Sequence, residues 1–176
     1  MRRLKIGGRL NLVSLAALAG LALVLALSLF RLNAVMRDDI ADRTRKTVEI
    51  AHSTLDHYQK LETAGKMTRA EAQAAALGAV RAMRYGKDDY FWINDMHPRM
   101  VMHPMKPEMD GTDISKKTDA DGNFMFQQMV DVVRAKGEGF VDYNWPKPGV
   151  EAAQPKISFV KGFAPWGWVI GPGVYV

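Results

Sequence analysis

The chain carries no charged residue from Leu10 to Phe30, and this run constrains its fold more than any other feature of the sequence. About 20 consecutive apolar residues are enough to cross a bilayer as an α-helix. The residues before the run include basic side chains and no acidic one, a bias that predicts a cytoplasmic N-terminus. We therefore expect a basic cytoplasmic arm over residues 1–9, a transmembrane helix over 10–30 and an exported domain over 31–176. A single span would place that domain outside the cytoplasmic (inner) membrane.

A cleaved signal peptide is the alternative interpretation of residues 1–28. Ala26, Leu27 and Ser28 form the small-x-small triplet that such a cleavage site requires. The uncharged run is longer than a usual signal-peptide core, and we therefore favour an uncleaved membrane anchor. Cleavage would instead release a soluble exported protein.

The net charge of +5 at pH 7 would favour a nucleic-acid partner only if it lay in the exported domain. Of the 24 basic residues, four precede Leu10, which leaves 20 against all 19 acidic residues. The exported domain is therefore close to neutral, and this gives no support to a basic nucleic-acid-binding surface. The sequence has no cysteine, which fits an oxidising compartment and equally fits many cytoplasmic proteins.

Two helices are expected after the uncharged run. Mixed charges come first, and from Val48 to Tyr58 apolar residues recur at spacings of three and four. This spacing predicts one long helix over 32–64, which begins as a solvated stalk, about residues 31–47, and then packs on a core. Thr68 and Glu71 have the spacing of a capping box, which starts a second helix.

Beyond the second helix, which we expect to end near residue 84, the hydrophobic period changes to two. Aromatic and β-branched runs predict five strands, near 90–94, 100–103, 140–145, 156–161 and 168–175. A third helix, about residues 122–135, interrupts them. This order of elements suits an antiparallel sheet with helices on its faces, which is an α+β fold.

Strand alternation divides the side chains between the two faces of the expected sheet. One face would pack on the long helix through Phe91, Ile93, Phe140, Ile157 and Phe159. The opposite face would carry Tyr90, Trp92, His103, Tyr143, Trp145, Lys156 and Ser158. On the second strand, Met100 and Met102 are expected to share a face, opposite His103.

The second of these faces has the composition of a small-ligand pocket, because its aromatic walls carry a few hydrogen-bond donors. The donors are phenol, indole, imidazole and ammonium groups, and no carboxylate accompanies them. Such a site favours an acceptor, most simply a small carboxylate. The segment from Met105 to Ala135 would lie over it as a lid. Each aromatic residue also has a plainer interpretation as a core residue with a satisfied polar tip, so the prediction rests on the whole set sharing one face.

Two aromatic segments bound the region of strands. They read Asp89-Tyr90-Phe91-Trp92-Ile93-Asn94-Asp95 and Pro165-Trp166-Gly167-Trp168-Val169-Ile170-Gly171-Pro172-Gly173-Val174-Tyr175. In order and character these segments make the chain resemble the single-Cache sensor domain of the second type, sCache_2, found in the extracytoplasmic region of methyl-accepting chemotaxis proteins. The resemblance implies a PAS-like Cache domain, with a long N-terminal helix and a five-stranded antiparallel sheet.

The resemblance also implies a function. In such receptors the exported domain binds small organic acids such as acetate, propionate, pyruvate or lactate, and it signals inward across the membrane. It further implies a homodimer, and a cytoplasmic signalling region that the sequence to Val176 does not contain. The alternatives are the same module in a histidine kinase or cyclase, and a stand-alone exported Cache protein.

Signatures of catalysis and of metal binding are missing from the sequence. Ser115 and Ser158 lack the glycine elbow that marks a nucleophile. Residues 119–123 have the wrong ligand order for a calcium loop, and His97 and His103 lack the spacing of a helical zinc pair. We therefore expect no enzyme activity, no cofactor and no metal site. The expected partners are a small monocarboxylate, the membrane and a second copy of the chain.

The glycines of Gly171-Pro172-Gly173, in the last strand, predict either a bulge or a close approach between backbones. The long helix joins the first membrane span, and the last strand would join a second one. We therefore expect a ligand to shift these two elements relative to each other. A bulkier residue at position 173 is expected to preserve ligand affinity and to uncouple it from the response.

Overall fold

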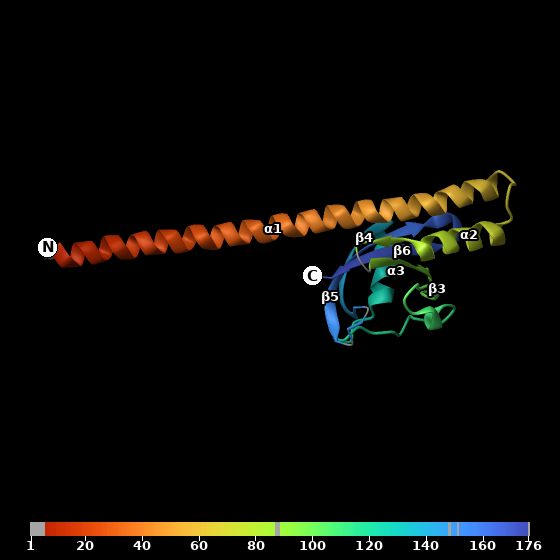
Figure 1. Ribbon diagram of the computed structural model, residues 1–176. Coiled ribbons are helices and arrows are strands. Elements are labelled where there is room, and N and C mark those ends of the chain that lie inside the picture. The colour runs from red at the N-terminus through yellow and green to blue at the C-terminus, as the bar shows by residue number, and fades with distance from the viewer. Residues whose placement is uncertain (1–5, 87–88, 148, 151, 176) are drawn as a thin grey trace. The chain divides into compact units, whose positions relative to one another are not determined.

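The computed structural model describes residues 6–86, 89–147, 149–150 and 152–175 of the chain (Figure 1). The chain divides into two compact units, Met1–Ile40 and Ala41–Val176. The helical elements are α1 (Ile6–Thr63), α2 (Arg69–Ala82) and α3 (Met125–Lys136), with the short 3-10 turns η1 (Pro107–Met109) and η2 (Ala164–Trp166). The strands are β1 (Arg84–Tyr85), β2 (Asp89–Asp95), β3 (Met100–Met102), β4 (Glu138–Pro146), β5 (Ala153–Phe163) and β6 (Trp168–Tyr175).

The first unit contains the N-terminal part of α1. The expected transmembrane segment, residues 10–30, is helical throughout. Within the described stretch Ala17–Thr63, an 18-residue window reaches a mean hydropathy of 2.0, and none of that window is buried. By length and composition this helix is sufficient to cross a membrane. Residues 1–5 of the expected basic arm lie outside the described residues.

The second unit is built on an antiparallel sheet with the strand order β1-β2-β6-β5-β4, and β3 pairs with β2. The helices lie on its two faces, with α1 and α2 on one side and α3 on the other (Figure 1). The α+β Cache architecture is therefore confirmed. The sheet has six strands among the described residues, however, where the sequence predicted five.

The additional strand, β1, follows α2 directly. α2 starts at the predicted capping box, in which Thr68 and Glu71 satisfy each other's backbone N–H groups. It ends at Ala82, and the chain then becomes extended. Gly86 adopts a φ of 61°, a left-handed conformation that glycine tolerates best, and this turn brings β1 back onto β2. A strand of two residues leaves no hydrophobic period, which explains why the sequence pattern missed it.

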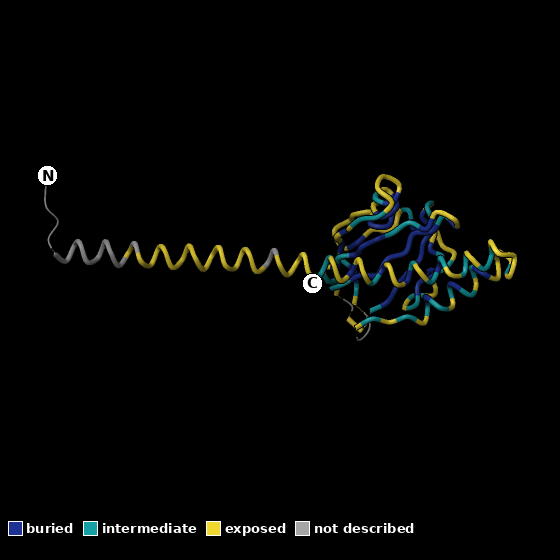
Figure 2. Tube along the Cα trace, turned by 90° about the horizontal axis from the view of Figure 1, so that it is seen from above, coloured by how far each residue is buried: buried dark blue, intermediate teal, exposed yellow. Residues whose placement is uncertain are grey.

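One face of the sheet forms a dry core with α1 and α2. Val48, Ala51 and Leu55 of α1 are buried at the predicted spacing. They belong to one core cluster with Phe91, Ile93 and Phe159, which are three of the five sheet residues expected to face the long helix. Phe140 lies on the edge strand β4, stacks on Phe159 with ring centres 4.8 Å apart, and stays 37% exposed. Thr44 of α1, within the expected stalk, is already buried, and Figure 2 shows the exposed trace of the described N-terminal part of this helix in yellow.

The strand alternation breaks at β3. Met102 belongs to the core beneath α1 and α2, whereas Met100 belongs to the core on the other face. The register of β3 against β2 shifts between Ile93 and Asn94, which is the signature of a β-bulge. The prediction that both methionines share a face is therefore wrong, because the bulge interrupts the alternation of side chains between the two faces of the sheet.

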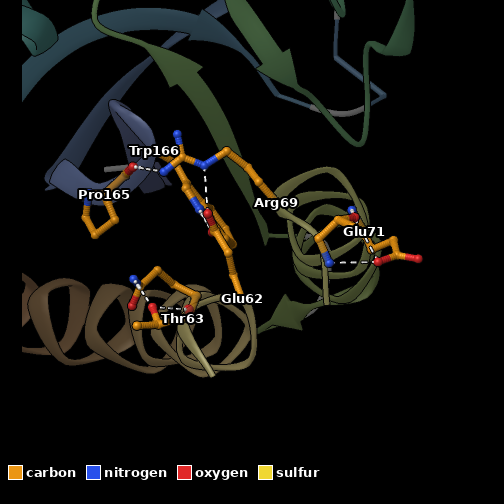
Figure 3. A network of polar contacts seen from close by, with 8 residues as sticks. Glu62, Thr63, Arg69, Glu71, Pro165 and Trp166 are labelled. Atoms are coloured by element: carbon orange, nitrogen blue, oxygen red, sulfur yellow. Dashed lines mark hydrogen bonds and ion pairs between the residues drawn. The ribbon is translucent and has the colours of Figure 1, made fainter. Parts of the chain in front are cut away.

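A polar network fastens the end of α1 to the start of α2 and to η2 (Figure 3). The Glu62 carboxylate accepts hydrogen bonds from Trp166 Nε1 at 2.7 Å and from Arg69 Nε at 2.8 Å. Arg69 also donates to the carbonyl of Pro165 at 3.2 Å. The bond from Trp166, followed by that from Arg69, lowers the pKa of Glu62. These contacts fix the helical hairpin to the turn that starts β6.

Candidate ligand-binding site

The segment between β3 and β4 covers the second face of the sheet. Its buried apolar residues pack against three aromatic residues of the strands: Met109, Ile114, Met125, Phe126 and Met129 against Trp92, Tyr143 and Trp145. The expected lid, Met105 to Ala135, therefore lies over the face that was predicted to carry the site.

Lys156 occupies the centre of this face, and its side chain is only 2% exposed. Its Nζ lies 4.6 Å from the ring centre of Tyr90, 4.5 Å from that of Tyr175 and 5.8 Å from that of Trp92. Nζ donates to Tyr90 Oη at 3.4 Å and to Tyr175 Oη at 3.3 Å. None of the ion pairs between described residues involves Lys156. Aromatic rings and phenols thus hold an ammonium that has no ion-paired counter-ion in the described part of the chain, and such burial costs free energy.

The protonation of Lys156 reflects this environment. Burial lowers the pKa of Lys156 to about 7, and the negative charge of Asp89 opposes the shift only in part. An ammonium has three N–H donors, and two of those of Lys156 have hydrogen-bond partners among the described residues. An anion at Nζ would supply both a third partner and the missing negative charge.

His103 and Trp145 extend the aromatic cluster around Tyr90. The ring centre of His103 lies 4.9 Å from that of Tyr90 and 6.5 Å from that of Trp145. His103 Nδ1 accepts from the backbone N–H of Lys106 at 3.0 Å, which leaves the ring proton of a neutral histidine on Nε2. Burial lowers the pKa of His103 to about 3, and the positive charges of Lys156 and Lys106 act in the same direction. His103 is therefore neutral near pH 7 and acts as a donor through Nε2.

The remaining predicted residues satisfy their polar atoms within the protein. Tyr143 Oη and Ser158 Oγ share a hydrogen bond of 2.9 Å, and burial raises the pKa of Tyr143. Trp92 Nε1 donates to Asn94 Oδ1 at 3.1 Å. The structure thus gathers Tyr90, His103, Trp145 and Lys156 into one cluster, and places Trp92, Tyr143 and Ser158 beside it as core residues.

Tyr175 contacts Lys156 directly, although the sequence pattern did not single it out as a site residue. The antiparallel register of β5 and β6 places these two residues opposite each other. The Tyr175 hydroxyl also donates to the carbonyl of Pro146 at 3.0 Å, and burial raises its pKa. Alternation along the last strand puts residues 173 and 175 on one face, but only the register shows which residue of β5 they meet.

A pocket of about 510 Å³ opens beside the cluster. Its described lining contains two lysines and no acidic residue: Tyr90, Met105, Lys106, Pro146, Lys147, Gly149 and Val150. Lys106 Nζ lies 4.6 Å from the ring centre of Trp145, and Lys147 Nζ lies 5.6 Å from that of Tyr175. These two cations give the pocket that leads to Tyr90 a positive potential, which attracts anions. The sequence pattern did not single them out.

Gly173 makes room for the buried lysine. A Cβ at this position would lie 1.9 Å from Lys156 Cε and 2.7 Å from Ser158 Oγ. The register of β6 is continuous with both neighbours, so close approach, and not a bulge, explains the glycine. Tyr85 Oη accepts from Gly173 N and donates to Gly173 O, both at 2.9 Å. A bulkier residue here would displace Lys156, so the expectation that it preserves ligand affinity conflicts with a ligand-binding role for that lysine.

The sequence segment 119–123 has a structural role. Asp119 Oδ1 accepts from the backbone N–H groups of Asp121 and Asn123, and Asp119 Oδ2 accepts from that of Asn144. These bonds fold the loop and fasten it to β4. Among the described residues, no group of three or more His, Cys, Asp or Glu side chains is arranged to hold a metal ion.

The family model of the single Cache domain 2, sCache_2, matches residues 36–176. The chain therefore belongs to the single Cache domain 2 family, as its aromatic segments predicted.

Two curated relatives illustrate where such domains occur. Methyl-accepting chemotaxis protein McpP of Pseudomonas putida is 44% identical over 176 residues, which are 100% of this chain and 32% of McpP. The sensor histidine kinase MctS of Rhizobium johnstonii is 34% identical over 107 residues, which are 61% of this chain and 23% of MctS. The chain thus spans about a third of the length of the first relative, and less of the second.

Two solved structures share the fold. A periplasmic sensor domain of a chemotaxis protein is 50% identical with a TM-score of 0.75, over 78% of this chain and 97% of that one. A second structure is described as "Structural basis for carboxylic acid recognition by a Cache chemosensory domain". It is 47% identical with a TM-score of 0.78, over 80% of this chain and 96% of that one. The chain is therefore homologous to sensor domains of chemoreceptors.

Proposed function

We propose that this chain is the sensor portion of a membrane chemoreceptor, and that it binds a small organic acid outside the cytoplasmic membrane. The proposed ligand is a monocarboxylate of two or three carbons, such as acetate, propionate, pyruvate or lactate. The observation that carries the proposal is the buried ammonium of Lys156, which has aromatic walls and no ion-paired carboxylate among the described residues.

The arrangement around Lys156 supports a carboxylate as the ligand. In the proposed complex the carboxylate accepts from Lys156 Nζ, from His103 Nε2 and from the hydroxyl of Tyr90, while the hydroxyl of Tyr175 keeps its bond to the carbonyl of Pro146. Trp145 forms an apolar wall, and its contact with Lys106 keeps a further cation near the entrance. The carboxylic acid named for one homologous Cache structure agrees with this chemistry. The cluster has donors for binding, and the homologous chains are sensor domains, so we propose binding without chemical conversion.

The membrane arrangement is part of the proposal. Residues 1–9 form a cytoplasmic arm, residues 10–30 a transmembrane anchor, and residues 31–176 a periplasmic sensor domain. The hydropathy of α1 and the periplasmic origin of one homologous structure support this order. We also propose that the domain works as a homodimer and signals to a cytoplasmic region beyond this chain.

A sensor histidine kinase is the second candidate, and the similarity to MctS favours it. Both candidates use the same sensor and differ in the region that receives the signal. Fusion of residues 1–176 to a chemoreceptor signalling region and, separately, to a kinase region would distinguish them. A ligand-dependent response in the kinase fusion alone would favour the second candidate.

The test of the ligand is calorimetry on the full chain in lipid nanodiscs with acetate, propionate, pyruvate and lactate. A charge-assisted hydrogen bond contributes about 1.5–3 kcal/mol, so Lys156→Ala should weaken binding by about one to two decades. Lys161→Ala is the matched control, because Lys161 lies on the same strand and pairs with Glu138 at 2.8 Å. This control should leave the affinity unchanged. Equal affinity in Lys156→Ala and in the unmodified chain would remove Lys156 from the site.

A further inference from the structure

The buried lysine gives the proposed site a second property, which concerns protons. An ammonium that is taken out of water without a counter-ion releases its proton more readily than one in solvent. A carboxylate placed against the same nitrogen favours the charged form again. Occupied and empty sites therefore differ in how strongly Lys156 holds its proton.

We propose that the pocket takes up a carboxylate together with a proton, which Lys156 receives from solvent. Occupancy of the sensor would then depend on both the concentration of the carboxylate and the pH of its surroundings. This inference rests on the proposed function, because it requires a carboxylate at Lys156. Its geometrical basis is the 2% exposure of Lys156, the two phenols as hydrogen-bond partners and the three rings within 5.8 Å.

The titratable and charged groups near Lys156 come from several elements. They are Asp89 and Tyr90 of β2, Tyr175 of β6, Tyr143 of β4, Tyr85 of β1, His103 and Lys106 after β3, and Lys147 after β4. Burial raises the pKa of each of these tyrosines, so they stay neutral near pH 7. Burial lowers the pKa of His103 to about 3, so it also stays neutral there. In contrast, burial places the pKa of Lys156 at about 7, within the range where pH changes its charge.

The sign of the effect follows from these directions. In the empty site, Lys156 loses its proton as the pH rises through about 7. A bound carboxylate raises the pKa of Lys156, so the occupied site loses this proton at a higher pH. Between the pKa of the empty site and that of the occupied site, binding of the carboxylate is accompanied by the uptake of a proton. The ligand itself stays ionised, since carboxyl pKa values lie near about 4. The association constant should therefore fall by about tenfold from about pH 6 to about pH 8.

The decisive measurement uses propionate and the full chain in nanodiscs. Calorimetry at about pH 8 in phosphate and in Tris, buffers with different ionisation enthalpies, reports the protons that accompany binding. We expect about one proton taken up per propionate at about pH 8 and close to none at about pH 6. Equal heats in the two buffers at about pH 8, with binding intact, would overturn the inference and leave the proposed function standing. Failure of all four acids to bind at either pH would overturn the proposed function itself.

Two variants assign the proton to Lys156. Lys156→Arg keeps the charge and does not lose it in this range, so its propionate affinity should be independent of pH. Asp89→Asn should keep the proton uptake and move its midpoint to lower pH, because the charge of Asp89 raises the pKa of Lys156. Proton uptake that persists in Lys156→Arg would assign it to another group and overturn the inference. If Lys156→Arg does not fold, lysine-selective NMR of the unmodified chain follows the same titration, and no upward shift with propionate would contradict it.

Discussion

The two faces of the sheet use burial for opposite purposes. The face beneath α1 and α2 encloses a cluster of apolar and aromatic side chains, and its polar contacts lie at the rim, as in the Glu62 network. The face beneath α3 encloses a lysine, a histidine, a hydrogen-bonded serine and several tyrosines. Burial of apolar surface stabilises the first face, whereas burial of an ammonium costs free energy in the second. The comparison suggests that the first face provides the stability on which the second depends.

Truncation of the dry core should have the largest effect on stability. Leu55 is fully buried, so Leu55→Ala should lower the free energy of unfolding by about 2–5 kcal/mol. Ile50 on the same helix is 67% exposed, and Ile50→Ala as a control should change it by less than about 0.5 kcal/mol. Urea unfolding in detergent measures both. Propionate affinity of folded Leu55→Ala should be unchanged, and a large loss of affinity would mean that the two faces are not independent.

Replacement of the buried charge should have an opposite effect on stability. Lys156→Met keeps a long side chain and removes the ammonium, so it should raise the free energy of unfolding by about 1–4 kcal/mol while weakening propionate binding by about one to two decades. The same urea experiment and calorimetry measure the two quantities. A Lys156→Met chain that is less stable than the unmodified one would show that the lysine contributes to stability, against the comparison.

Per pH unit, the pH dependence of stability should be the smallest effect that separates the two faces. The pKa of Lys156 is lowered from 10.5 to about 7, so the unfolded chain binds one more proton than the folded chain between these values. Stability of the ligand-free chain should therefore rise with pH across that window, by up to about 1.4 kcal/mol per pH unit. Thermal unfolding between about pH 7 and about pH 10 tests this, with Lys156→Met as the comparison. A rise of equal size in Lys156→Met would assign the effect to another group.

The sequence predicted the two faces because strand alternation has a fixed period, and Phe91 and Tyr90 fall on opposite sides as expected. It missed features that depend on local geometry or on distant partners. The bulge that separates Met100 from Met102 and the turn at Gly86 leave no period in the sequence. Tyr175 became visible as a site residue only through its register with Lys156.

The internal hydrogen bonds were also beyond the sequence pattern. Tyr143 and Ser158 lie on the predicted face, yet each satisfies the other's hydroxyl group. Trp92 likewise bonds Asn94, two residues along its own strand. A residue type on the right face therefore indicates a candidate, but the partners of its polar atoms decide whether a donor remains for a ligand.

The space above Gly173 links two positions in evolutionary terms. Since any Cβ there would occupy the place of the Lys156 side chain, the two residues form a pair that must change together. A descendant that exchanges Gly173 for a larger residue has to move the Lys156 side chain or replace it with a shorter one, and in either case the ammonium leaves its present place. The reverse order is open, because loss of the lysine leaves room at position 173. A glycine at position 173 and a lysine at position 156 would thus be retained together wherever the proposed anion-binding site is retained.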